Sequence, residues 1–217
     1  MASPPALAAV APYAALVPRP AADVAADLEA FHALLVKWQR VQNLVSRETL
    51  GEVWTRHVAD SLQLLLLLRP DDAAFLDLGS GGGFPALPLA IALKGRPCRF
   101  VLVEANARKA SFLRAVAREL GLAVTVDARR SEDIDPAQLG PIDVITARAL
   151  APLPVLCPLL APFFGPKTRA LLHKGREHVE ELAESGAVWH HDVVRHQSVT
   201  DAGGVVLEIS NLRLRTK

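Results

Sequence analysis

A glycine-rich loop beside acidic residues is the part of the sequence best suited to ligand chemistry. Residues 77–84 (DLGSGGGF) follow an apolar run that predicts a strand and precede one that predicts a helix. Glycines at such a junction let a ligand approach the backbone N–H groups closely. Phe84 stands where the NAD-binding fingerprint requires a small residue, and the Gly-Lys-Ser/Thr of a P-loop is absent. The loop is therefore predicted to bind a different ligand, with a purely structural turn as the alternative.

A further acidic residue, Glu104, ends the next predicted strand, residues 100–103. A carboxylate at that position can accept hydrogen bonds from the hydroxyl groups of a ribose. Strand, glycine loop, helix, strand and acid in this order resemble the S-adenosylmethionine-binding region of class I methyltransferases. By that resemblance, Gly79, Gly81, Gly83 and Glu104 would contact the cofactor, S-adenosyl-L-methionine.

The fourth predicted strand, residues 143–146, narrows the class of substrate. No Asn/Asp-Pro-Pro-aromatic motif follows it, which disfavours methylation of an exocyclic base amine. Cytosine C5 chemistry needs a cysteine nucleophile, and Cys157 lies in an apolar stretch that indicates a core position. Arg148 follows the strand, where the ends of parallel strands line a site, so it is predicted to face the ligand. A structural pairing of Arg148 with Glu132 is the alternative, and the two roles are compatible.

The elements that must position these residues follow an α/β pattern. Predicted strands at residues 74–78, 100–103, 124–126, 143–146 and 170–172 alternate with predicted helices at residues 84–93, 108–120, 151–164 and 178–183. Such alternation predicts a mostly parallel, Rossmann-like sheet with right-handed crossovers. Residues 189–199 and 205–214 predict a terminal β-hairpin.

Two helices are predicted before the sheet, one beginning after Asp23 and one over residues 49–68. We therefore expect a flexible Ala/Pro-rich arm over residues 1–20, a helical extension over residues 21–72 and a class I methyltransferase domain over residues 73–217. In the second helix, His57 and Asp60 lie with Ser61 on or beside the apolar face, so they need polar partners. They are interpreted as a structural pair that ties the extension to the sheet, with framing of the cofactor pocket as the alternative.

Further motifs make the chain similar to the GidB/RsmG family, the bacterial 16S ribosomal RNA guanine-N7 methyltransferases. The matching pieces are residues 43–46 (NLVS), 56–62 (RHVADSL), 77–85 (DLGSGGGFP), 88–91 (PLAI), 108–113 (RKASFL), 130–132 (RSE), 146–149 (TARA), 151–153 (APL) and 173–175 (HKG). They occur in the family's order and lie within about residues 38–182. By that resemblance, Gly79, Phe84, Ser131, Glu132 and Arg148 would contact the cofactor. The substrate would be N7 of a guanine in the 16S RNA of the small ribosomal subunit.

This chemistry asks for little catalytic apparatus. Guanine N7 carries an accessible lone pair, so no proton has to leave before it attacks a methyl group. The enzyme mainly has to align N7, the methyl carbon and the departing sulfur, and to exclude water. We therefore expect no essential general base, and for Arg148 a role in orientation and electrostatics.

The charge balance excludes a uniformly basic RNA-binding surface. Lys plus Arg total 24 and Asp plus Glu total 23, for a net charge of +1. A local patch could be assembled from Arg108, Lys109, Arg114, Arg118, Arg129, Arg130, Lys167, Arg169, Lys174, Arg176, Arg213, Arg215 and Lys217. Lys174, Arg108, Lys109 and Arg176 are the predicted RNA-binding residues, Lys174 first among them. Arg114 and Arg118 are expected on a solvated helix face.

Other features of the sequence set the expected cell context. The two cysteines, Cys98 and Cys157, form no Cys-x-x-Cys pair and suit a reducing cytoplasm. His190, His191 and His196 are interpreted as surface residues, and no metal site is expected. No membrane segment or signal peptide is expected, and the protein is predicted to be a monomer. Two other functions stay open: a methyltransferase acting on a small molecule or protein, and a non-catalytic, cofactor-binding ribosome-assembly factor.

Overall fold

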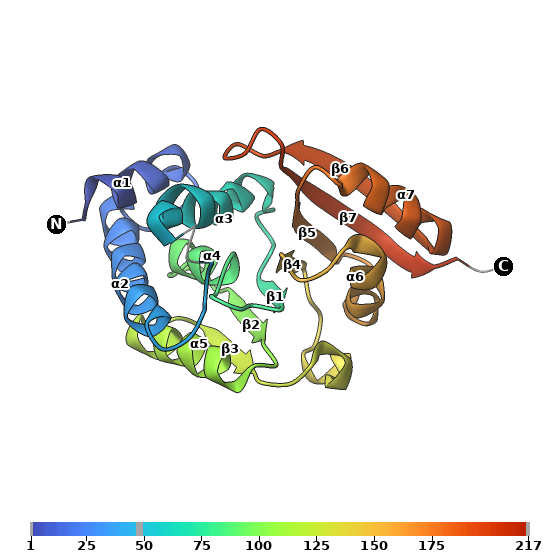
Figure 1. Ribbon diagram of the computed structural model, residues 1–217, viewed down its shortest axis with the longest axis horizontal. Helices are drawn as coiled ribbons and strands as arrows, with labels where there is room; N and C mark the ends of the chain where they lie inside the picture. The colour runs from blue at the N-terminus through green and yellow to red at the C-terminus, as the bar shows by residue number, and fades with distance from the viewer. Residues whose placement is uncertain (1, 47–49, 216–217) are drawn as a thin grey trace.

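A seven-stranded sheet with the order β3-β2-β1-β4-β5-β7-β6 forms the centre of the protein (Figure 1). The computed structural model describes residues 2–46 and 50–215. The strands are β1 (Ala74–Leu78), β2 (Arg99–Val103), β3 (Val124–Asp127), β4 (Val144–Arg148), β5 (Arg169–Lys174), β6 (Trp189–Gln197) and β7 (Val205–Leu214). The first five strands pair in parallel, and β7 runs antiparallel to both β5 and β6. The predicted α/β sheet with a terminal hairpin is therefore confirmed.

Helices cover both faces of the sheet. They are α4 (Ala86–Ala92), α5 (Ala107–Glu119), α6 (Leu153–Leu160) and α7 (His178–Val188), with short 3-10 turns η5 (Ser131–Asp133), η6 (Pro136–Gln138) and η7 (Ala161–Phe163). Successive side chains of β1 point to opposite faces. Phe75 packs in one core with Phe112 of α5, whereas Leu76 packs in a second core with Leu156 of α6. Cys157 is fully buried in this second core, as its apolar surroundings predicted.

The amino-terminal segment is helical and packed, which corrects the expectation of a flexible arm over residues 1–20. Helix α1 (Pro4–Val10) and the 3-10 turn η1 (Ala11–Tyr13) precede the long helix α2 (Ala21–Gln39). Prolines in the first turn are compatible with a helix, because N–H groups there have no intrahelical partner. Val10 and Tyr13 are buried. The small apolar side chains thus form a packing surface that prolines at the helix start do not disrupt.

The second predicted helix is an irregular helical segment. Its parts are η2 (Leu50–Glu52), the π-helical η3 (Val53–Ala59), α3 (Asp60–Leu62) and the 3-10 turn η4 (Gln63–Leu67). The predicted starting residue, Thr49, lies outside the described residues. A π-helical turn changes which side chains share a face, and such turns are common at functional sites. The change of helix type falls at Asp60.

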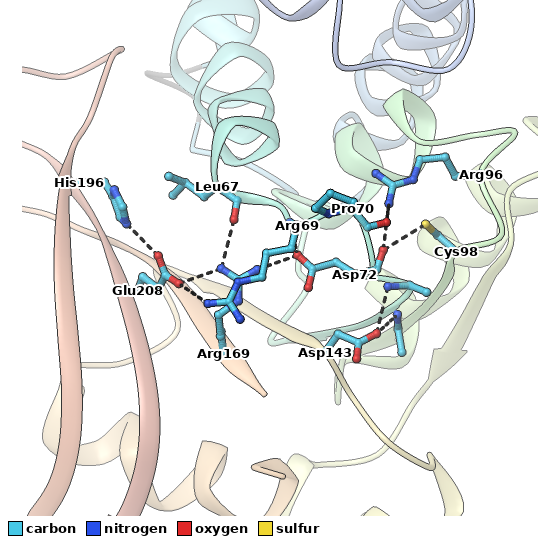
Figure 2. Close-up of polar contacts among 12 residues, drawn as sticks. Leu67, Arg69, Pro70, Asp72, Arg96, Cys98, Asp143, Arg169, His196 and Glu208 are labelled. Carbon is cyan, nitrogen blue, oxygen red and sulfur yellow. Dashed lines mark hydrogen bonds and ion pairs between the residues drawn. The ribbon is translucent and has the colours of Figure 1, made fainter. Parts of the chain in front are cut away.

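A buried ion-pair network joins this segment to the sheet (Figure 2). Arg169, at the amino end of β5, donates to Asp72 at 2.6 Å, to Glu208 of β7 at 2.8 Å and to the carbonyl oxygen of Leu67 at 3.1 Å. His196 of β6 approaches the other oxygen of Glu208 at 2.9 Å. Only 2% of Arg169 is exposed, so it cannot belong to an RNA-binding face as its charge suggested.

Within residues 2–46 and 50–215, no helix is both long enough and apolar enough to cross a bilayer. The last basic residue of the predicted patch, Lys217, lies outside the described residues.

Candidate functional site

The glycine loop connects the carboxyl end of β1 to α4. Gly79, Gly81 and Gly83 have φ angles of +69°, +52° and +88°, a region that favours glycine. At Gly83 the space is also closed, because an added Cβ would overlap the side chain of Leu87. Gly83 borders neither cavity beside the loop. Its positive φ and its closeness to Leu87 place it at the turn into α4.

A cavity of about 380 Å³ opens on the β2 side of the loop. Among the residues that line it are five of the predicted cofactor ligands: Gly79, Gly81, Glu104, Ser131 and Glu132. Glu104 accepts hydrogen bonds from the N–H of Gly81 at 2.8 Å and of Asn106 at 2.8 Å. Its carboxylate therefore links the glycine loop to the start of α5. Ser131 donates to Glu132 at 2.7 Å, so the two residues after β3 are fixed relative to each other.

A second cavity, of about 350 Å³, opens on the β4 side. It is lined by Leu44, Val45, Ser46, His57, Gly79, Ser80, Gly81, Gly82, Phe84, Lys109, Arg148 and Ala149. Gly79, Gly81, Lys109 and Ala149 line both cavities, so the two cavities adjoin each other. We call the pair of cavities the glycine-loop cleft. Seven of the eight predicted cofactor ligands line it, all except Gly83.

Arg148 is held by the helical extension. Its Nε lies 3.3 Å from a carboxylate oxygen of Asp60, and its Nη2 donates to the carbonyl oxygen of Arg56 at 2.8 Å. The alternative partner expected from the sequence, Glu132, is bonded to Ser131 instead. Burial is the main cause that lowers the pKa of Arg148, and Asp60 opposes that shift. The carboxylate thus compensates a cation that the fold takes partly out of water.

The sequence predicted that His57 and Asp60 together tie the extension to the sheet. In the structure, Asp60 makes these contacts to the sheet. Nε2 of His173, on β5, lies 2.9 Å from the carbonyl oxygen of Asp60. Because a carbonyl only accepts, Nε2 carries the proton. His57 instead packs its ring 5.0 Å from that of Phe84 and lines the cleft, as the alternative interpretation proposed. Burial first and Arg148 second lower the pKa of His57 to about 4, so it is neutral at neutral pH.

Gln39 is a positioning residue that the sequence analysis missed. Its Oε1 accepts from the N–H of Leu44 at 2.8 Å and of Val45 at 3.2 Å, while its Nε2 donates to the carbonyl oxygen of Val45 at 2.8 Å. The side chain thereby replaces the strand partner that this irregular segment lacks. Gly82 approaches the same segment, since an added Cβ would lie 2.8 Å from the carbonyl oxygen of Leu44. A polar residue at the end of a helix, just before a polar break, was the available signal.

Asp77 supports the loop from below. Its side chain is buried, with Oδ1 accepting from the hydroxyl of Thr146 at 2.6 Å. Desolvation by burial raises the pKa of Asp77 to about 7. Asp77 does not line the cleft, and its hydrogen bond to Thr146 joins the base of the loop to β4.

The predicted RNA-binding residues are split by the fold. Lys109 lines the glycine-loop cleft, and Arg108 is exposed beside it on α5. Arg176 is exposed beyond β5. Lys174 is different: only 8% of its side chain is exposed, and its ammonium group donates to Glu181 at 2.7 Å and to the carbonyl oxygen of Ala151 at 2.8 Å. Lys174 is therefore not a free phosphate ligand, contrary to its rank in the sequence analysis.

The described residues hold no candidate metal site. Within residues 2–46 and 50–215, no group of three or more His, Cys, Asp or Glu side chains could hold a metal ion.

The chain is similar to known proteins along most of its length. Residues 24–209 match the family GidB, described as rRNA small subunit methyltransferase G. A ribosomal RNA small subunit methyltransferase G of Bartonella tribocorum is 43% identical over 200 residues, which cover 91% of this chain and 92% of the relative. One of Cereibacter sphaeroides is 46% identical over 184 residues, covering 84% and 87%.

A solved structure supports the fold independently. The O-methyltransferase from Bacillus cereus in complex with SAH aligns with a TM-score of 0.58 at 15% identity, over 86% of this chain and 91% of that one. At this identity the likeness concerns the fold alone. The class I methyltransferase fold predicted from the sequence is confirmed.

Proposed function

The chain belongs to the GidB family of rRNA small subunit methyltransferases G, and on that premise we propose that it methylates N7 of a guanine in 16S ribosomal RNA. The methyl donor is S-adenosyl-L-methionine. The observation that carries the proposal is the glycine-loop cleft, two adjoining cavities at the carboxyl ends of β1, β2 and β4. Seven separately predicted cofactor ligands meet in it, although they come from distant parts of the sequence.

The cleft suits the two ends of this cofactor. On the β2 side, Glu104 would accept hydrogen bonds from the ribose, and Ser131 and Glu132 would adjoin the base. On the β4 side, Arg148, whose charge Asp60 balances, would donate a hydrogen bond to the methionine carboxylate beside the backbone of Gly79. The fit is testable without catalysis, because cofactor binding can be measured in the absence of RNA. The extension also contributes Leu44, Val45, Ser46 and His57 to the cleft, so we propose that residues 21–72 and 73–217 work as one unit.

The chain's own residues act on the reaction by position and charge. When bound, the cofactor supplies an electrophilic methyl group on a sulfonium. N7 forms a bond to the methyl carbon as the sulfur–carbon bond breaks, and the positive charge passes to the base. No proton moves at N7, so neutral His57 is not required as a base. Arg148, restrained by Asp60, orients the reactants.

RNA binding would use the exposed basic residues near the cleft. Arg108 and Lys109, at the start of α5, and Arg176 would meet phosphates of the small ribosomal subunit. Because the net charge is only +1, we expect a local contact whose affinity falls as salt rises. The enzyme would act in the cytoplasm, where these subunits are assembled.

The test is a transfer assay with methyl-labelled S-adenosylmethionine and small subunits that lack the modification. Nucleoside mass spectrometry is expected to find new 7-methylguanosine. Labelling of another nucleoside would contradict the N7 assignment. Cofactor binding together with subunit binding, but without any product, would favour the non-catalytic assembly factor. Cofactor binding with no labelled RNA and no subunit binding would favour a small-molecule or protein substrate.

A further inference from the structure

A third cavity adjoins the glycine-loop cleft. It has a volume of about 250 Å³ and lies between the carboxyl ends of β4 and β5 and the loop that joins β6 to β7. We call it the hairpin cavity; it is lined by Asp60, Arg148, Ala149, His173, Lys174, Gly175, Ser198, Asp201, Gly204 and Val205. It shares Arg148 and Ala149 with the β4 side of the cleft. A group bound in the hairpin cavity would therefore lie next to one bound over the glycine loop.

Ala149 stands where the cavities meet. It lines the hairpin cavity and both halves of the glycine-loop cleft. Its φ angle is +52°, in the left-handed region that residues other than glycine seldom adopt. Backbone strain of this kind is retained where the surrounding structure demands it, often at functional sites.

The cations of the hairpin cavity are already neutralised. Arg148 faces Asp60, and Lys174 faces Glu181. His173 has its Nε2 at the carbonyl oxygen of Asp60, and burial lowers its pKa, so it adds no charge at neutral pH. These walls do not offer a free cation to a phosphate. They suit an uncharged, polar ligand.

Asp201 is the accessible acceptor of the cavity. It is exposed, and one carboxylate oxygen, Oδ1, accepts from the N–H of Gly203 at 2.9 Å. That bond fixes the side chain within the loop between β6 and β7. Within residues 2–46 and 50–215, its Oδ2 has no hydrogen-bond partner. A ligand with two neighbouring N–H donors matches a carboxylate held in this way.

We propose that the hairpin cavity holds the target guanine base and that Asp201 accepts hydrogen bonds from its N1–H and 2-amino groups. The proposal rests on the proposed function and identifies the subsite for its substrate. Guanine presents two donors at this edge, whereas adenine presents an acceptor at N1, so the contact selects guanine. N7 lies on the opposite side of the base from N1. A base held at the hairpin loop by its donor edge turns N7 toward Ala149 and the glycine-loop cleft.

The charges favour the direction of the reaction. As the N7–carbon bond forms and the sulfur–carbon bond breaks, positive charge moves from the cofactor to the base. Asp201 lies on the side that receives this charge, whereas Asp60 there is already paired with Arg148. The base must leave its stack to enter the cavity, as in other enzymes that modify bases.

Two substitutions of Asp201 separate recognition from a structural role. Asp201→Asn keeps an oxygen for the N–H of Gly203 but replaces the free oxygen with an N–H donor, which opposes the donors of guanine. Asp201→Ala removes both interactions. We expect kcat/KM on unmodified small subunits to fall about 10- to 100-fold for Asp201→Asn. The fall for Asp201→Ala should be equal to this or smaller. Affinity for S-adenosylhomocysteine and the Tm of Asp201→Asn should stay at wild-type values.

Asp192→Asn is the matched control, because Asp192 is an exposed aspartate on β6 that lines none of the three cavities. It should keep wild-type kcat/KM. A wild-type rate for Asp201→Asn, with a loss only for Asp201→Ala, would overturn the proposal, because it would assign Asp201 to the loop turn. Equal losses of cofactor affinity and kcat/KM would also overturn it. If the wild-type protein yields no 7-methylguanosine, the proposed function itself fails, which the same assay shows before any variant is compared.

Discussion

Arg148 Nε lies 3.3 Å from the Asp60 carboxylate, across the boundary between the helical extension and the sheet. Asp60 also accepts from Thr200 of the β6–β7 loop at 2.8 Å and from Gln63 at 2.7 Å. One carboxylate therefore orders the arginine at the end of β4 and the loop that closes the hairpin cavity. The extension is part of the site and not an appended module.

Arg148→Lys is expected to weaken binding of S-adenosylhomocysteine about 10-fold or more. Lysine keeps the charge but loses the fork that contacts Asp60 and the carbonyl oxygen of Arg56 together. Hydrogen bonds to charged groups contribute about 1.5–3 kcal/mol, which sets this magnitude. Isothermal titration calorimetry measures the change. Arg118→Lys, at an exposed position of α5, is the control. Unchanged affinity in Arg148→Lys would exclude the arginine from cofactor binding.

Gln39→Ala is expected to lower cofactor affinity, although Gln39 is not one of the predicted cofactor-binding residues. The substitution removes three hydrogen bonds to the backbone of Leu44 and Val45, so the wall of the cleft loses its support. The lost hydrogen bonds should lower the free energy of unfolding or of cofactor binding by about 1–3 kcal/mol in total. Hydrogen exchange of residues 44–46, compared with and without S-adenosylhomocysteine, measures the effect. If protection of these residues stays as in the wild type, Gln39 does not position the wall.

Gly82→Ala is expected to displace the same wall by pushing on it. Its Cβ would lie 2.8 Å from the carbonyl oxygen of Leu44, and backbone atoms there cannot move aside as a side-chain tip can. We expect a cofactor affinity at least several-fold weaker, at a cost of about 1–3 kcal/mol for overpacking. Gly186→Ala, in α7 with open space around its Cβ, is the control and should bind normally. A normal affinity for both variants would contradict the prediction.

Arg169→Ala is expected to destabilise the fold by about 3–5 kcal/mol, because it leaves buried carboxylates without their partner. Asp72 and Glu208 would lose ion pairs of 2.6 and 2.8 Å (Figure 2). Urea unfolding measures the loss. Arg69→Ala serves as the control, since its 3.5 Å contact to Glu208 is half-exposed and should contribute below about 1 kcal/mol. A similar loss of unfolding free energy in both variants would show that the buried ion pairs of Arg169 do not stabilise the fold more than an exposed one.

Asp77 predicts a pH dependence of stability. Burial raises its pKa to about 7 from 3.8, so between these values the folded protein holds a proton that the unfolded chain releases. The contribution is complete below pH 3.8 and is lost as pH rises through about 7. Relative to Asp77→Asn, the wild type should lose about 2 kcal/mol between pH 5 and pH 8. Urea unfolding of both proteins across this range tests the sign. A difference that is constant with pH would contradict the raised pKa.

Local patterns in the sequence determined the chemistry of the loop and the succession of elements. The glycines between β1 and α4, and Glu104 at the end of β2, are placed by neighbours within a few residues. Hydrophobic periodicity and glycine geometry act over the same short range. For this reason the sheet, the hairpin and the glycine loop could be predicted before any tertiary contact was known. Phe84, Ser131, Glu132 and Arg148 were named from the family resemblance, and their place beside the cleft is a tertiary feature.

Only the tertiary structure decided which polar side chains are partners. Arg148 and Asp60 meet because η3 and α3 pack against the ends of β4 and β5. Glu181 of α7 forms an ion pair with Lys174 and balances its charge. Asp201 reaches the same end of the sheet because the hairpin docks antiparallel beside β5. A charge in the sequence carries no record of its burial or of its counter-ion. Burial and pairing arise from the order of the strands and the docking of the helices, which sequence patterns alone do not determine.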